Sequence, residues 1–164
     1  MKRIALISDN HSYPADEILP YLEEVDEVWH AGDIGSLESI DVINDRWPIK
    51  GVYGNIDDKD VRAEYPLNQV FYCEDVKVVM THIGGYPGRY TKRVSELLQQ
   101  EKPKLYICGH SHICKVLYDK KLELLHMNPG AYGIIGWHKI RTILRFSIDG
   151  ADIKDAQVIE LGKR

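Results

Sequence analysis

The sequence predicts an α/β protein in which two β-sheets pack face to face and helices flank them, as a single domain over residues 1–164. Three observations lead to this prediction. Short apolar runs closed by polar residues fill the first half of the chain, strand-like stretches dominate the second half, and no Pro-, Ser- or Gly-rich linker separates the halves. With 44% hydrophobic residues over 164 positions, the chain can bury a core without disulfides or a structural metal.

The first half of the chain alternates strands and helices. Residues 4–7 form a continuous apolar run, the pattern of a strand buried on both faces. Residues 15–24 carry apolar side chains at helical spacing, although Pro20 would kink this helix or mark its first turn. Residues 28–31 and 49–53 are the second and third predicted strands, each closed by a glycine and a polar residue.

A shorter helix is expected between the second and third of these strands. Leu37, Ile40 and Ile43 recur at helical spacing, and Ser36 is the expected N-cap. The resulting order of strand, helix, strand, helix, strand predicts a parallel sheet. Its functional site should lie at the carboxyl edge, where polar residues follow each strand.

The second half of the chain predicts a second sheet. Residues 70–73 and 76–81 have the pattern of a β-hairpin, and residues 91–101 carry one apolar face and stop before Pro103, as a helix would. Further strands are expected at residues 105–108, 115–118, 122–126, 139–148 and 152–161.

Charge and cysteine usage narrow the function classes. Lys and Arg total 21 against 25 for Asp and Glu, a net charge of -4, so a broad nucleic-acid surface is not expected. The chain begins with an apolar run too short for the core of a signal peptide, and no stretch approaches the roughly 20 apolar residues of a membrane span. These features predict a cytoplasmic protein with no membrane partner and with reduced thiols at Cys73, Cys108 and Cys114.

Seven side chains that can bind a metal ion come directly after predicted strands, three of them next to a glycine. In a parallel sheet such positions gather at the carboxyl edge, where α/β proteins place their sites. Each one taken alone has an ordinary alternative, such as a turn, a helix cap or a hydrogen-bonded core histidine. The seven are Asp9, His11, Asp33, Asn55, His82, His110 and His112.

The segment at residues 109–112, Gly-His-Ser-His, is the most specific of these signals. On an extended segment, imidazoles two residues apart can reach the same or adjacent metal ions, while Ser111 points away. Asp9 and His11 have the same spacing, and we expect both to point to one side. Structural roles are expected for the remaining histidines: His30 and His126 in strands, and His138 in a loop.

Taken together, the ordered motifs D-x-H, G-D, G-N-x-D, T-H-x-G and G-H-S-H resemble those of the calcineurin-like metallophosphoesterase superfamily. The resemblance runs from Ile4 to about Gly130. The short length, the early G-N-x-D and the Asn-Pro-Gly at residues 128–130 look most like the small YfcE-type phosphodiesterase branch. This resemblance implies a four-layer sandwich fold and the hydrolysis of a phosphate ester, for which a small phosphodiester or nucleotide-like compound is the expected substrate.

The resemblance also implies a dinuclear metal centre. By position, one ion would be held by Asp9, His11, Asp33 and His112, and the other by Asp33, Asn55, His82 and His110, with Asp33 as the bridge. Asp33, Asn55 and His82 would carry the catalytic roles. Manganese is the expected metal, while nickel, iron, zinc and magnesium also suit carboxylate and imidazole donors. Two such ions can lower the pKa of a shared water and aim the hydroxide at phosphorus.

Two positions depart from the family pattern. Many larger members have a histidine near the leaving group, where this chain has Ile56, so we expect a preference for good leaving groups and for diesters. Ala131 stands where relatives often have serine, which removes a hydroxyl contact.

Residues around these motifs have expected supporting roles. Asp57 is expected to orient a metal ligand or the Asn55 loop by hydrogen bonds, with a helix-start carboxylate as the alternative. Arg89, with Tyr86 and Tyr90, is a candidate for substrate contact because arginine can bind a phosphate through two N–H groups; solvated loop residues are the alternative.

Two other functions remain open from sequence. The first is a scaffold that keeps the fold without the chemistry, as in the retromer subunit that resembles this family; seven intact donors favour the enzyme over it. The second is a single structural zinc site, which seven donors without a thiolate disfavour. A homodimer through the apolar stretch at Ile134, Ile135 and Trp137 is also expected.

Overall fold

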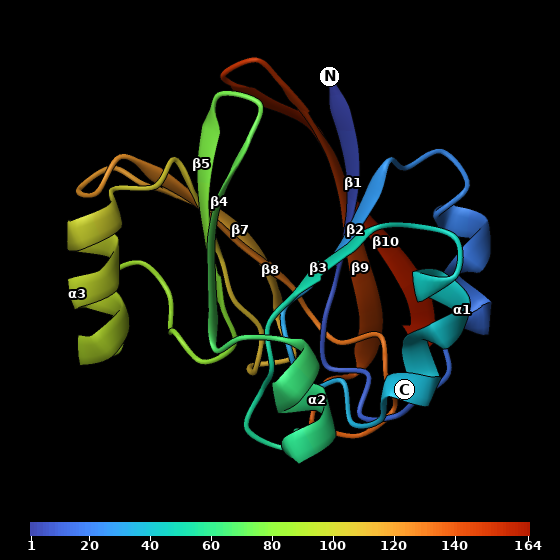
Figure 1. Ribbon diagram of the computed structural model, residues 1–164. Helices are drawn as coiled ribbons and strands as arrows, with labels where there is room; N and C mark the ends of the chain where they lie inside the picture. The colour runs from blue at the N-terminus through green and yellow to red at the C-terminus, as the bar shows by residue number, and fades with distance from the viewer.

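Two five-stranded sheets pack face to face in the computed structural model, which describes residues 1–164 (Figure 1). The first sheet has the order β10-β9-β1-β2-β3, and the second has the order β4-β5-β6-β8-β7. Helices lie on the outer face of each sheet, so the predicted sandwich of two sheets flanked by helices is confirmed.

The first sheet combines parallel and antiparallel pairs. β1 pairs in parallel with β2, and β2 with β3, as the alternating pattern of the first half predicted. The antiparallel β9 joins the other side of β1, placing Leu6 between Trp29 and Leu144, and β10 completes the sheet. Its strands are β1 (Lys2–Ile7), β2 (Glu27–His30), β3 (Ile49–Gly51), β9 (Ile140–Asp149) and β10 (Asp152–Lys163).

The second sheet is also mixed. The predicted hairpin is the antiparallel pair β4-β5, and the parallel pairs β5-β6 and β6-β8 form the middle of the sheet. The antiparallel strand β7 lies at the far edge. The strands are β4 (Asn68–Cys73), β5 (Val76–Thr81), β6 (Leu105–Ile107), β7 (Cys114–Asp119) and β8 (Leu124–Pro129).

The helices are shorter than the sequence predicted. The helix expected at residues 15–24 is the 3-10 helix η1 (Asp16–Tyr21), because Pro20 lies inside it and cannot donate a backbone hydrogen bond. The helix expected after Ser36 is split into η2 (Leu37–Ile40) and α1 (Asp41–Asn44), and Ser36 makes no side-chain cap. The helix predicted at residues 91–101 is confirmed as α3 (Lys92–Glu101), with Thr91 as its N-cap.

One helix was not predicted. Helix α2 (Lys59–Glu64) begins at Asp58, whose side chain accepts hydrogen bonds from the backbone N–H groups of Asp60 and Val61. Val61 is its only buried residue, so the helix carries no periodic apolar pattern that the sequence could reveal.

The main core lies between the two sheets. Ile4 and Trp29 of the first sheet pack there with Met80 and Ile107 of the second, and all four are fully buried. A second cluster lies under η1 and α1, and a third under α3, which accounts for four layers. The loops after β1, β2 and β3 gather near α2 at the lower edge in Figure 1.

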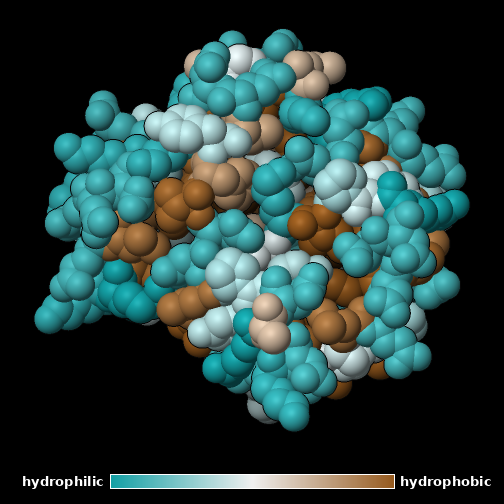
Figure 2. All heavy atoms as spheres, in the orientation of Figure 1, coloured by the Kyte–Doolittle hydropathy of each residue, from teal (hydrophilic) through white to brown (hydrophobic).

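The surface seen in Figure 2 is mostly hydrophilic, with separate small apolar patches in its middle. Trp137 is 100% exposed and Ile134 and Ile135 are about half exposed, so the stretch expected to mediate dimerisation is accessible, while the dimer itself stays a prediction. No helix has both the length and the apolar character needed to cross a bilayer.

His126 predicts a pH dependence of stability. It is buried in β8 beside the ring of Tyr106, and burial lowers its pKa to about 4. The folded protein therefore resists a proton that the unfolded chain accepts near pH 6.5, so this contribution to stability is complete above about pH 6.5 and is lost as pH falls toward 4. Between pH 7 and pH 5, chemical denaturation should show the wild type losing about 1–2 kcal/mol more than His126→Gln. Parallel curves for the two proteins would contradict this.

Candidate metal centre

All seven predicted donors lie at one end of the sandwich, because the strands that precede them end there. Asp9 and His11 follow β1, Asp33 follows β2, and Asn55 follows β3. In the second sheet, His82 follows β5, and His110 and His112 follow β6. The carboxyl ends of parallel strands from two sheets thus place these side chains together.

The donor atoms form two overlapping groups. Asp9, His11, Asp33 and His112 each offer an atom within 4.8 Å of the others, and Asp33, His82 and His110 form a second such group. His112 Nε2 lies 3.1 Å from Asp9 Oδ1, and His82 Nε2 lies 3.1 Å from Asp33 Oδ2. Asp33 belongs to both groups, as a bridging ligand would.

Asn55 lies at the exposed side of the second group. Its Oδ1 atom is 3.0 Å from His110 Nδ1, and both side chains are exposed, whereas Asp9 is fully buried and Asp33 and His82 nearly so. A substrate therefore has access to the centre from the side of Asn55 and His110.

Three buried atoms at the centre have no hydrogen-bond partner: Asp9 Oδ1, His11 Nε2 and His82 Nε2. Burying a polar atom without a partner costs about 1–3 kcal/mol, more when the group is charged. These atoms converge on the space between Asp9 and Asp33, where a divalent cation would satisfy them together. The residues present therefore fit the metal ions that the fold family implies.

The tautomers of two donor histidines support the same conclusion. His82 Nδ1 lies 2.7 Å from the carbonyl oxygen of Ala31, which can only accept, so Nδ1 carries the proton and Nε2 faces the carboxylates. His138 Nε2 donates to the carbonyl of Gly133 at 2.8 Å, which leaves its Nδ1 to accept from His112 Nδ1 at 3.1 Å. His112 Nε2 is then also directed at the centre.

The sequence did not reveal this role of His138. We predicted a structural residue in a loop, and His138 does lie in a loop, but its contact with His112 orients one of the predicted metal ligands. No local pattern could have shown it, because the two residues are 26 positions apart.

The prediction that the paired donors lie on extended backbone is wrong. Asp9, His11, Asp33, His110 and His112 all have positive φ, between 46° and 71°, so each donor lies in a left-handed turn. Such turns cost about 1–3 kcal/mol per residue, and they cluster at functional sites. Here they turn successive donors into the centre, which alternation along a strand would not do.

Glycines make this close packing possible. A Cβ atom at Gly32, which has φ of 100°, would lie 2.6 Å from His82 Nδ1, and one at Gly54 would overlap the Asp33 carboxylate. The glycines before Asp33 and Asn55 therefore let these two loops reach the other donors.

His30 and Asp57 hold the donor loops in place. Gly32 N–H donates to His30 Nδ1 at 3.1 Å, so the opposite nitrogen, Nε2, donates to Asn10 Oδ1 at 2.9 Å and links the loops after β1 and β2. Full burial lowers the pKa of His30 to about 3 and keeps it neutral.

Asp57 accepts backbone hydrogen bonds from Gly35 and Gly54, both at 2.7 Å, and from Ile34 at 3.2 Å. These bonds join the Asp33 loop to the Asn55 loop, as expected of an orienting residue. The alternative of a helix-start carboxylate is wrong, because Asp58 caps α2.

Of the three residues predicted to contact substrate, only Tyr86 lies beside a metal-binding candidate. Tyr86 lines a cavity of about 160 Å³ together with His110, whereas the Tyr90 hydroxyl donates to Asp119 at 2.7 Å. Arg89 is exposed and lines neither that cavity nor the one that contains His82.

Asn128 donates to the Gly109 carbonyl at 2.9 Å and so positions the loop that carries His110 and His112.

The charges at the centre depend on one another. Burial opposes ionisation of Asp9, but His11 and His112 hold the pKa of that carboxyl below its usual range. Burial likewise opposes ionisation of Asp33, but His11 and His82 keep its pKa low. The neighbouring Asp33 and Asp9 carboxylates raise the pKa of His11 to about 9, so without metal a proton occupies this imidazole at pH 7.

Metal binding should therefore release protons. Because His11 must lose its proton to act as a ligand, we expect manganese binding at pH 7 to release at least one proton per chain. The apparent affinity should rise about tenfold per pH unit up to about pH 9. Calorimetry in buffers of different ionisation enthalpy measures both quantities. Binding without proton release, at an affinity independent of pH, would contradict the assignment of His11.

Asp57→Asn should weaken metal binding. Asparagine places an NH₂ group against the backbone N–H donors of Gly35 and Gly54, so we expect manganese affinity to fall about 10–100-fold in calorimetric titration. Asp58→Asn is the matched control, because asparagine also caps helices and the cap lies outside the centre. Equal affinities for the two variants would contradict the role of Asp57.

Known proteins are similar to this chain in sequence and in fold. A probable metallophosphoesterase from Methanothermobacter thermautotrophicus is 26% identical over 165 residues, covering 97% of this chain and 92% of the relative. Among solved structures, zinc-complexed Vps29 from Entamoeba histolytica has a TM-score of 0.72 at 16% identity, covering 98% of this chain and 99% of that one.

A protein described as a novel archaeal phosphodiesterase has a TM-score of 0.69 at 22% identity, covering 96% of this chain and 99% of that one. At these identities the two solved structures show a shared fold. The model of the calcineurin-like phosphoesterase superfamily domain matches residues 1–151, and this chain therefore belongs to that superfamily.

Proposed function

We propose that the chain is a phosphodiesterase that uses two divalent metal ions, manganese first among them, to hydrolyse a small nucleotide-like phosphodiester. Membership of the superfamily supports a metal-dependent phosphoesterase. The observation that carries the dinuclear proposal is the pair of overlapping donor groups that share Asp33. The resemblance in fold to the archaeal protein described as a phosphodiesterase favours a diester substrate.

The buried residues of the centre have distinct roles in the proposed reaction. When bound, divalent ions would supply charge stabilisation at the phosphoryl group and lower the pKa of the attacking water. Asp9 and Asp33 are buried and carry the negative charge that attracts the cations. His82 is held by the Ala31 carbonyl in the tautomer that donates a lone pair at Nε2. In this proposal Asp33, Asn55 and His82 are the catalytic residues.

Asn55 faces the side from which a substrate can approach. Its amide oxygen is neutral, so it adds no charge that would repel a phosphate, and its Nδ2 group can donate to a phosphoryl oxygen. The next residue, Ile56, is 44% exposed and has no proton to give to a leaving group. The site is therefore suited to esters whose leaving group departs as a stable anion.

The scaffold alternative draws on the similarity in fold to Vps29. Three unpartnered buried atoms and two left-handed aspartates are costly to maintain, and bound metal ions would offset this cost. Because the Vps29 structure also contains zinc, it is membership of a phosphoesterase superfamily that favours the enzyme.

Hydrolysis of bis(p-nitrophenyl) phosphate tests the proposal. Metal-stripped protein should be inactive and should regain activity on addition of manganese, with nickel, zinc and magnesium as comparisons. Asp33→Ala should lower kcat/KM at least about 10³-fold, because it removes the shared ligand from both groups. Asp45→Ala, which removes an exposed carboxylate at the end of α1, should retain full activity. A folded wild type that is inactive with every metal would instead favour the scaffold.

A further inference from the structure

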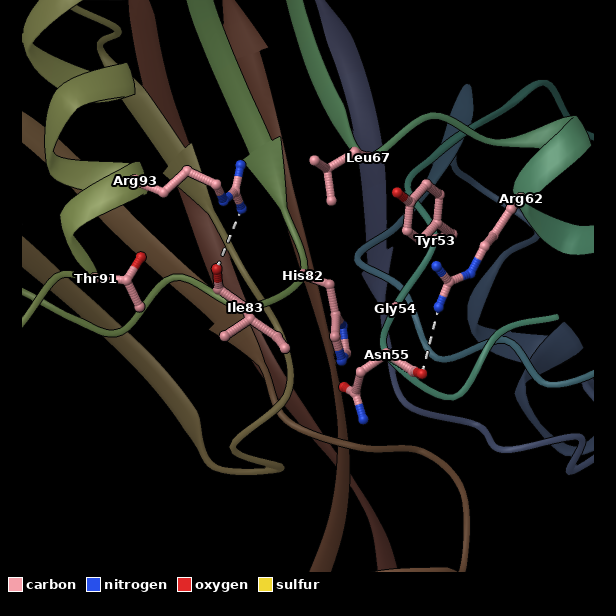
Figure 3. Close-up of a pocket in the computed structure, with 9 residues that line it drawn as sticks. All are labelled: Tyr53, Gly54, Asn55, Arg62, Leu67, His82, Ile83, Thr91 and Arg93. Atoms are coloured by element: carbon pink, nitrogen blue, oxygen red, sulfur yellow. Dashed lines mark hydrogen bonds between the residues drawn. The ribbon is translucent and has the colours of Figure 1, made fainter. Parts of the chain in front are cut away.

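A cavity of about 420 Å³ opens beside the metal-binding side chains, between the loops that follow β3 and β5 (Figure 3). His82 and Asn55 are part of its lining, so it is continuous with the centre described above. Figure 3 shows Arg93 and Arg62 on opposite sides of this cavity, with His82 and Asn55 between them. Neither arginine was singled out from the sequence.

Both guanidinium groups lack a carboxylate partner. No Asp or Glu oxygen lies within 4.0 Å of either one. Arg62 donates to the carbonyl oxygens of Asp57, at 2.7 Å, and of Asn55, at 3.5 Å. Two positive charges therefore flank the cavity in a protein whose net charge is -4.

Arg93 is tied to neutral oxygens. Its Nη1 donates to Asn68 Oδ1 and its Nη2 to Thr81 Oγ1, both at 2.8 Å, and Nη2 also approaches the Ile83 carbonyl at 3.4 Å. A guanidinium has five N–H groups, so both arginines keep donors that these contacts do not use. The bonds fix the position of each charge without neutralising it.

Part of the cavity lining is apolar or aromatic, at Tyr53, Leu67 and Ile83. Leu67 is 42% exposed and Ile83 is 38% exposed, and the Arg62 guanidinium stacks over the Tyr53 ring at 4.6 Å. Apolar and aromatic walls favour a flat organic group, and the stacked arginine adds a charged edge to the same surface.

We infer that this cavity binds the body of the substrate and that the positive charges of Arg62 and Arg93, on opposite sides of the cavity, attract a second phosphate on it. This inference rests on the function proposed above. The ligand class is a nucleotide-like phosphodiester in which a ring system separates the scissile phosphate, at the metal centre, from a terminal phosphate. Arginine suits that role because its planar N–H groups match phosphate oxygens in pairs.

Two probes separate the terminal phosphate from the reaction itself. Thymidine 5′-(p-nitrophenyl phosphate) and its 3′-phosphorylated form release the same p-nitrophenolate, and they differ only in the second phosphate. With manganese-loaded wild type we expect kcat/KM at least tenfold higher for the 3′-phosphorylated probe.

Arg62→Gln and Arg93→Gln should each reduce this preference about tenfold, and because the preference is a ratio of two kcat/KM values within one variant, a general change in activity does not affect it. Glutamine can keep a bond to the neutral oxygens, so a folding defect is separated from a lost charge. Arg46→Gln is the matched control, since Arg46 also stacks on an aromatic ring, that of Trp47, and lies outside the cavity.

The result that overturns the inference is equal kcat/KM for the two thymidine probes, or a preference that both variants retain, in an enzyme that hydrolyses bis(p-nitrophenyl) phosphate. If no probe is hydrolysed, the proposed function fails, and equilibrium binding decides the cavity separately. Manganese-loaded protein should then bind thymidine 3′,5′-bisphosphate at least tenfold more tightly than thymidine 5′-phosphate, with the difference lost in both variants. Equal binding would overturn the inference.

Discussion

Asp9 and Asp33 are two carboxylates buried where the loops of both sheets meet, and their negative charge determines which groups can lie beside them and in which protonation state. A buried carboxylate needs a cation or several donors close by, because burial removes the water that would otherwise stabilise it. Here the neighbours are imidazoles, which can present a proton or a lone pair. Protons on histidines such as His11 and metal cations at the centre therefore compete to neutralise the same buried negative charge.

Hydrogen bonds around this charge fix the tautomers of the neighbouring histidines, so that a particular ring nitrogen faces the centre. The Ala31 carbonyl sets the tautomer of His82, and His138 sets that of His112. His30 is fully buried and neutral, and it holds the two aspartate loops together rather than binding metal. Such supporting contacts explain why a chain with seven histidines directs only some of them at the centre.

The exposed side of the centre has a different character from its buried side. Carboxylates lie at depth, where they attract cations, while Asn55 and the cavity beside it present neutral and positively charged groups. This order of charges, from negative inside to positive outside, suits a phosphate that must approach the cations without meeting carboxylates. The absence of a proton donor at Ile56 then limits which leaving groups the same geometry can serve.

The sequence by itself determined which donors follow which strands. Short apolar runs predict strands because a strand that is buried on both faces needs apolar side chains on both. The order of Asp9, Asp33, Asn55, His82 and the histidine pair along the chain is read directly from the sequence. These facts were enough to predict the two sheets and the edge that carries the site, and the resemblance of the ordered motifs to a known family then singled out the seven donors that the structure brings together.

Only the tertiary structure decided the rest. Left-handed turns at the donors, the role of His138 and the two arginines at the cavity all depend on contacts between residues far apart in the chain. His82 and Ala31, for example, are 51 positions apart. Local patterns cannot encode such pairs, because the energy of a tautomer, a strained turn or an unpaired charge is set by whichever groups folding places beside it.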